Sequence, residues 1–63
     1  MNDAEARELH PEFYGKFYNF FRRGFFYTIE LGSDAQAREN AEYNLGTIRV
    51  EDVNGNIVLP INN

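Results

Sequence analysis

A run of large apolar side chains between residues 13 and 27 dominates the pattern of this chain. In its first half the phenylalanines stand at the spacing of one helical face: Phe13, Phe17, Phe20 and Phe21. Pro11 suits the first position of a helix, and Gly24, which follows two arginines, is typical of a helix C-terminus. The spacing therefore predicts an aromatic helix over residues 11–23.

The second half of the run alternates instead. The apolar residues that share one side of an extended chain there are Phe25, Tyr27, Ile29 and Leu31. Aromatic and β-branched residues in alternation indicate a strand. We expect this strand to span residues 25–31 and to end at Gly32.

Ser33 and Gln36 match the serine-x-x-glutamine pattern of a helix capping box. The pattern predicts a helix over residues 34–44, with small inward-facing residues such as Ala37. Ser33 is the only serine of the chain. As a nucleophile it would need a base beside it, whereas a cap needs nothing more, so we interpret it as a cap.

Residues 47–61 alternate on both sides of Asn54-Gly55, the favoured dipeptide of a two-residue type I′ hairpin turn. A turn at this position pairs Val50 with Leu59, and Ile48 with Ile61. Pro60 cannot donate a ladder hydrogen bond, so the last strand is expected at an edge or to end there.

These elements predict a small α+β domain over residues 1–63, in the order α-α-β-α-β-β. Residues 1–10 form a short helical or frayed arm. The sheet has three strands, and the C-terminal hairpin packs against the helices. The sequence leaves open which hairpin strand adjoins residues 25–31.

Composition limits the cellular compartment and the means by which the fold can be stabilised. The formal net charge is −4, and the chain has no cysteine. No apolar run reaches the 18 or so residues of a membrane span, and no basic start with an apolar stretch marks a secretory signal. We expect a cytoplasmic protein, complete from Met1, without a membrane association. A chain this small buries about 60% of its unfolded surface, so a dense aromatic core or self-association must stabilise it.

The sequence gives little support for a catalytic site or a metal site. One histidine, one serine and no cysteine cannot assemble a nucleophile–base pair. Asp52, Asn54 and Asn56 have the first spacings of a calcium loop. However, Ile57 stands where glycine is needed, and Asn63 stands where glutamate is needed. We predict no enzyme activity, no cofactor and no metal.

The surplus of aromatic residues indicates a binding surface. On the predicted helix, Tyr14, Tyr18 and Arg22 share a face beside the core-facing phenylalanines, with Lys16 and Arg23 nearby. Tyrosine and arginine are enriched at protein interfaces. We predict a non-enzymatic protein–protein interaction module that binds another protein or itself, as a regulator or inhibitor of a larger protein. In composition, the chain resembles the small acidic accessory proteins of phages and mobile elements.

The alternative is single-stranded nucleic-acid binding through the aromatic and basic segment 13–27. Rings that stack on bases and cations that contact phosphates form such surfaces. Ten acidic residues against six basic ones make nucleic acid the less favoured partner.

Overall fold

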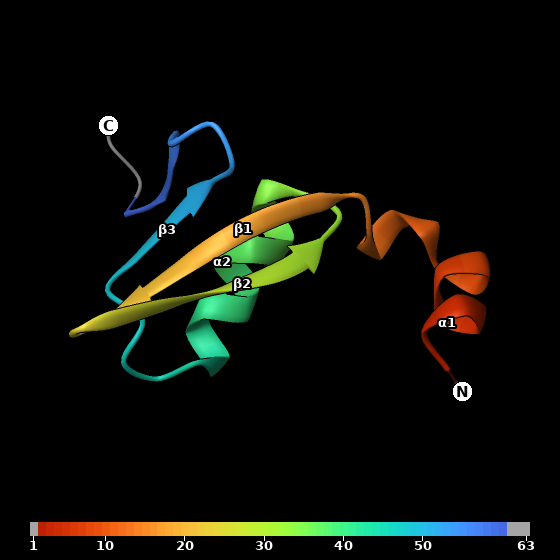
Figure 1. The fold of residues 1–63 in the computed structure, drawn as a ribbon, viewed down its shortest axis with the longest axis horizontal. Helices are drawn as coiled ribbons and strands as arrows, with labels where there is room; N and C mark the ends of the chain where they lie inside the picture. The colour runs from red at the N-terminus through yellow and green to blue at the C-terminus, as the bar shows by residue number, and fades with distance from the viewer. Residues whose placement is uncertain (1, 61–63) are drawn as a thin grey trace.

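An antiparallel sheet with a helix across one face organises the fold. The computed structural model describes residues 2–60, and Figure 1 shows the sheet, the helix behind it and a short helical arm beyond one end. Within this range the elements are, in chain order, α1 (Asp3–Leu9), the 3-10 helix η1 (Pro11–Phe13), β1 (Lys16–Arg22), β2 (Phe25–Leu31), α2 (Asp34–Tyr43), β3 (Arg49–Asp52) and β4 (Ile57–Leu59).

The predicted fold class is wrong in element order and strand number. The described chain is a small α+β structure whose four antiparallel strands lie in the order β2-β1-β3-β4, with two α-helices. The aromatic helix predicted over residues 11–23 is replaced by η1 and β1. Because β1 lies between the hairpin and β2, neither hairpin strand adjoins residues 25–31.

The misreading has a physical cause. The phenylalanines of residues 13–21 satisfy a helical spacing, but short apolar runs cannot distinguish a helix from a buried strand by periodicity alone. Aromatic residues favour strands, and β1 gains hydrogen-bonded neighbours on both sides, β2 and β3. Arg23-Gly24, interpreted as a helix end, is instead the turn that joins β1 to β2. Gly24 has φ +91°, the sign that a type II turn requires at its second central position.

The loop of the β3–β4 hairpin differs from the predicted turn. The Gly55 amide donates to the Asp52 carbonyl oxygen (3.1 Å), and the Asp52 amide donates to the Asn56 carbonyl oxygen (3.0 Å). Gly55 has φ +83° while Asn54 does not have a positive φ. These features define a three-residue loop that ends in a left-handed glycine, so the predicted two-residue type I′ turn is wrong.

A β-bulge in β4 compensates for the one-residue shift in strand pairing that the three-residue loop creates. Glu51 pairs with Ile57, whereas Val50 pairs with Leu59, so Val58 is an extra residue on β4. The predicted pairing of Val50 with Leu59 is therefore confirmed. The predicted pairing of Ile48 with Ile61 lies outside the described residues.

α2 begins at the predicted residue. The Gln36 amide donates to Ser33 Oγ (3.2 Å), and Gln36 Oε1 accepts from the Gly32 amide (2.8 Å). Gln36 Nε2 also donates to the Glu12 carbonyl oxygen (3.1 Å), which ties η1 to the start of the helix. Gly32 is needed here because a Cβ at this position would overlap the Glu12 carbonyl oxygen.

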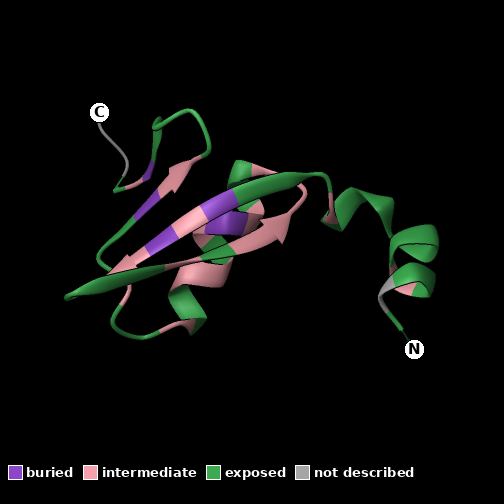
Figure 2. Cartoon of the chain, in the orientation of Figure 1, coloured by how far each residue is buried: buried purple, intermediate pink, exposed green. Residues whose placement is uncertain are grey.

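The core lies between the sheet and α2. Its buried side chains within residues 2–60 are Tyr18, Phe20, Ala37, Val50 and Val58. Figure 2 shows these positions on β1, β3, β4 and the facing side of α2. Tyr27, Ile29, Leu31, Ala41 and Leu59 pack around them. Side chains alternate along β1, so Phe17, Asn19 and Phe21 point to the opposite face.

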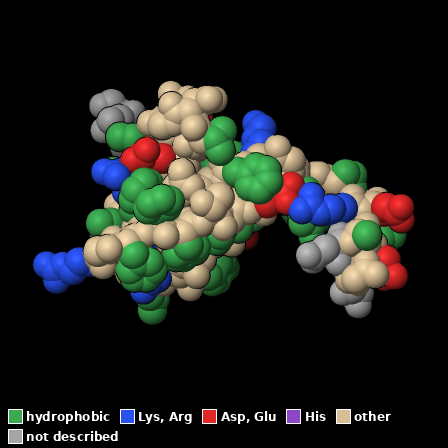
Figure 3. Space-filling view, in the orientation of Figure 1, with side chains coloured by type: hydrophobic (Ala, Val, Ile, Leu, Met, Phe, Trp, Pro, Cys, Tyr) green, Lys and Arg blue, Asp and Glu red, His purple; other side chains and the backbone are tan. Residues whose placement is uncertain are grey.

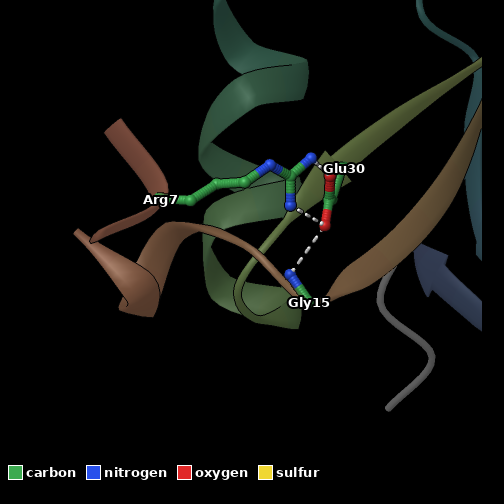
Figure 4. A network of polar contacts seen from close by, with 3 residues as sticks. All are labelled: Arg7, Gly15 and Glu30. Atoms are coloured by element: carbon green, nitrogen blue, oxygen red, sulfur yellow. Dashed lines mark hydrogen bonds and ion pairs between the residues drawn. The ribbon is translucent and has the colours of Figure 1, made fainter. Parts of the chain in front are cut away.

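The Glu30 carboxylate holds the N-terminal arm against the sheet. Both Glu30 carboxylate oxygens accept from the Arg7 guanidinium, and Oε2 also accepts from the Gly15 amide at 3.1 Å (Figure 4). The Arg7 guanidinium also lies 4.8 Å from the Tyr14 ring centroid. None of the helices within residues 2–60 is long and apolar enough to cross a membrane.

Candidate docking face

The sheet face opposite α2 carries side chains from all its strands. β1 residues that alternate with Tyr18 and Phe20 point there, and the register assigns their neighbours on β2, β3 and β4 to the same side. We call this surface the open face. Its residues are Phe17, Asn19, Phe21, Phe26, Thr28, Glu30, Arg49, Glu51 and Ile57.

Phenylalanines are the largest groups on the open face. Phe17 is 48% exposed, Phe26 is 56% exposed, and Ile57 is 54% exposed. Phe21 and Phe26 face each other across β1 and β2, with ring centroids 5.1 Å apart. Figure 3 looks onto this face and shows hydrophobic groups over the sheet, with charged groups mainly at its margins and on the arm. No element within residues 2–60 covers these rings.

The polar groups of the open face are largely paired with one another. Thr28 Oγ1 donates to Asn19 Oδ1 at 2.7 Å, in the middle of the β1–β2 ladder. Arg49 Nε lies 2.7 Å from Glu51 Oε2. The remaining acid, Glu30, binds Arg7 of the arm. The face therefore presents apolar rings with charges that are already matched.

The tyrosine-based surface predicted from a helical face is not assembled by the strand. Tyr18 is 1% exposed and lies in the core. Tyr14 lies under Arg7, between η1 and β1, and is half-buried. Arg22, on the α2 side of β1, is half-buried with its guanidinium 5.9 Å from the Phe25 ring centroid. Lys16, at the start of β1, and Arg23, in the turn, are exposed.

The Tyr18 hydroxyl is held by an acidic neighbour. It donates to Asp34 Oδ1 at 2.7 Å. The pKa of Tyr18 is raised to about 12, first by burial, then by the hydrogen bond to Asp34 and by the negative charges of Asp34 and Asp52. A neutral phenol is thus built into the contact between β1 and the first turn of α2.

A shallow pocket of about 260 Å³ opens beside this hydroxyl. It is lined by Gly15, Lys16, Phe17, Tyr18, Asp34, Asp52, Val53 and Asn54. Asp52 is committed to the hairpin loop, since Oδ1 accepts from the Asn54 and Asn56 amides, each at 2.9 Å. The Asn56 side-chain amide, which donates to Asp52 Oδ2 at 3.0 Å, lowers the pKa of the Asp52 carboxyl most, and the backbone amides lower it further. In the part of the chain that the structure describes, no three acidic or histidine side chains gather to hold a metal ion.

Sequence reasoning missed the open-face residues Phe17, Phe21, Phe26, Arg49 and Ile57 as a surface. A signal was present in the doublets Phe20-Phe21 and Phe25-Phe26, which flank the turn at Arg23-Gly24. Consecutive strand residues point to opposite faces, so a doublet cannot place both rings in one core. Recognising residues 16–22 as a strand would have revealed the second aromatic face.

Comparison of the chain with protein family models, curated proteins and solved structures found no match.

Proposed function

We propose that this chain is a non-enzymatic protein-binding module that docks through its open face. The observation that carries the proposal is the group of half-exposed rings, Phe17, Phe21 and Phe26, on a sheet face that no described element covers. Exposed apolar groups gathered on one face are typical of interaction sites, and aromatic residues are enriched at protein interfaces.

The arginine of the open face suits the same role. The Arg49 guanidinium lies over the Phe21 ring and against Glu51. A side chain held in this way loses little freedom when a partner covers it, which reduces the entropic cost of association. Arginine stacked on an aromatic ring is also among the groups that dominate binding energies.

Nucleic acid fits this geometry less well. A single-strand platform combines stacking rings with cations along the backbone path. Lys16 and Arg22 belong by their register to the α2 side of β1, and Arg23 lies in the turn. Of these basic residues, Arg22 lies near the exposed Phe25 on the α2 side, so they are separated from the rings of the open face. Arg49, on that face, is paired with Glu51. These placements support a protein surface as the partner.

A photo-crosslinking comparison tests the proposal. Benzoylphenylalanine replaces Phe26 in one variant and Phe25 in another, and each is irradiated in the native host. Phe26 and Phe25 are neighbours on β2 with similar exposure, 56% and 58%, but they point to opposite faces. We expect a discrete crosslinked protein product from position 26 and none from position 25. No product from position 26, or the same product from both positions, would contradict the proposal.

A further inference from the structure

We propose that the occupant of the open face is a second copy of this chain, packed sheet to sheet. The inference rests on the proposed docking function and identifies its partner. Two open faces in contact would form a sandwich of two sheets, with one α2 on each outer side. Sheets that pack in this way lie about 10 Å apart, with strand directions within roughly 30° of each other.

The chemistry of the face defines what can cover it. Its cation Arg49 is paired with Glu51, and Glu30 is paired with Arg7. An occupant therefore needs to bring no compensating charge, and any unpaired charge that it brought would be buried without a partner. It must instead offer rings, methyl groups and self-satisfied polar pairs. The open face has this composition, so a second copy of it meets the requirement.

The distribution of charge permits this contact in spite of the net charge of −4. The segment 34–43 carries three acids against one arginine, and the segment 3–12 carries four acids against one arginine. The α2 acids Asp34, Glu39 and Glu42 are exposed on the layer behind the sheet. In a sheet-to-sheet dimer the two α2 helices lie on the outer surfaces. Both sheets then separate their negative charges, and solvent screens the repulsion between them.

The open face is also compatible with two-fold symmetry. Phe17 lies toward one end of β1, Phe21 and Phe26 lie at the other end, and the Asn19–Thr28 pair lies between them. Consider a two-fold axis that lies between the two sheets and crosses the strands at a right angle at the level of Asn19. It would bring each Phe17 over the Phe21–Phe26 pair of the other copy. The rings are self-complementary in such a contact, as an isologous interface requires. Glu51 lies at the level of Asn19, so the two Glu51 carboxylates would face each other, each paired with Arg49 of its own chain.

A second copy would also add buried apolar surface, of which the core has little. Within the described residues five hydrophobic side chains are buried, and one of them is alanine. Chains of this size often gain stability from oligomerisation. The sheet is roughly 20 Å in each direction, so the contact is small compared with the roughly 800 Å² per partner of a standard interface. We therefore expect a dimer that dissociates on dilution.

Sedimentation equilibrium of the full chain tests the inference, from about 10 μM to about 1 mM, where interfaces of this size dissociate. The mass should rise with concentration from 7.3 kDa toward twice that value. Phe26→Ser should weaken the dimer by about tenfold or more, while Phe25→Ser should change its dissociation constant by less than about twofold. Circular dichroism of both variants checks that the fold is kept.

Two outcomes would overturn the inference. One is a mass that stays at 7.3 kDa throughout the concentration range, and the other is a dimer that Phe25→Ser weakens as much as Phe26→Ser. The crosslinking comparison separates this failure from that of the docking proposal. A monomeric chain whose position 26 crosslinks to a different protein would refute the second copy but support the docking face. A monomeric chain without any crosslink at position 26 would refute both.

Discussion

The Arg49 guanidinium lies 4.2 Å from the centroid of the Phe21 ring, on the sheet face opposite α2. The ring, the guanidinium and the Glu51 carboxylate form a ladder across β1 and β3 that fixes a long, otherwise mobile side chain at the surface. Removing such a group should affect association more than folding.

Arg49→Gln is therefore expected to separate the two properties. The free energy of unfolding should change by about 0.5 kcal/mol or less, as for most exposed side chains, while dimerisation weakens because the stacked cation is lost. Arg23→Gln, in the exposed turn, is the matched control and should leave both unchanged. Urea titration and sedimentation equilibrium measure the two quantities. Equal association of both variants and the wild type would show that Arg49 is not part of the contact.

Gly55→Val should destabilise the chain by about 1–2 kcal/mol, because a β-branched residue resists the positive φ at this position. Asn54→Ala should cost clearly less, since Asn54 does not have a positive φ in the three-residue loop. Thermal unfolding of both variants decides between the loop types. A comparable loss for the two substitutions would point back to a type I′ turn, which needs positive φ at both positions.

Tyr18 should make stability depend on pH in the alkaline range. Its pKa is raised from 10.0 to about 12 in the folded chain, first by burial and then by Asp34. The folded state therefore disfavours the ionised phenol. The contribution is complete below pH 10.0, where the unfolded phenol also stays protonated, and is lost as the pH rises toward about 12.

Chemical unfolding of wild type and Tyr18→Phe at several pH values measures this linkage. The free energies of unfolding of the two proteins should converge as the pH rises through that range, because phenylalanine has no proton to lose. At neutral pH the variant should be less stable by about 1 kcal/mol, the net value of one hydrogen bond. A constant difference across the range would mean that the phenol ionises as easily in the folded chain as in the unfolded one.

Glu30→Gln should release the N-terminal arm without unfolding the sheet. The hydrogen bond from Arg7, followed by that from the Gly15 amide, lowers the pKa of the Glu30 carboxyl from its ordinary value of 4.5. The ionised form holds the arm, so this fastening is complete above pH 4.5 and weakens as the pH falls through the lower folded-state pKa. Glutamine should reproduce the weakened state at neutral pH.

Hydrogen exchange of the α1 amides reads out this change. Protection of α1 should fall in Glu30→Gln while β1 and β2 keep theirs. Glu42→Gln, on the exposed side of α2, is the control and should leave α1 protection unchanged. An arm that stays equally protected in both variants would show that Glu30 does not fasten it.

Local chemistry made part of the fold predictable. The Ser33 cap depends on a spacing of three residues, and the strand at Phe25–Leu31 depends on strict alternation, so neighbouring residues suffice to indicate each one. β1 depends on distant partners, β2 and β3, and its spacing is compatible with a helix. The open face could not be found without β1, because its members meet only once four separate segments are aligned.

The two outer strands of the sheet differ in how readily another chain could extend it. β4 has three residues, contains the Val58 bulge and is followed by Pro60, features that prevent further pairing. β2 has seven residues in an unbroken register with β1. Any aggregation of the folded chain by strand addition should therefore begin at the edge of β2, which no strand of residues 2–60 covers. A lysine or proline placed at Thr28 would suppress it.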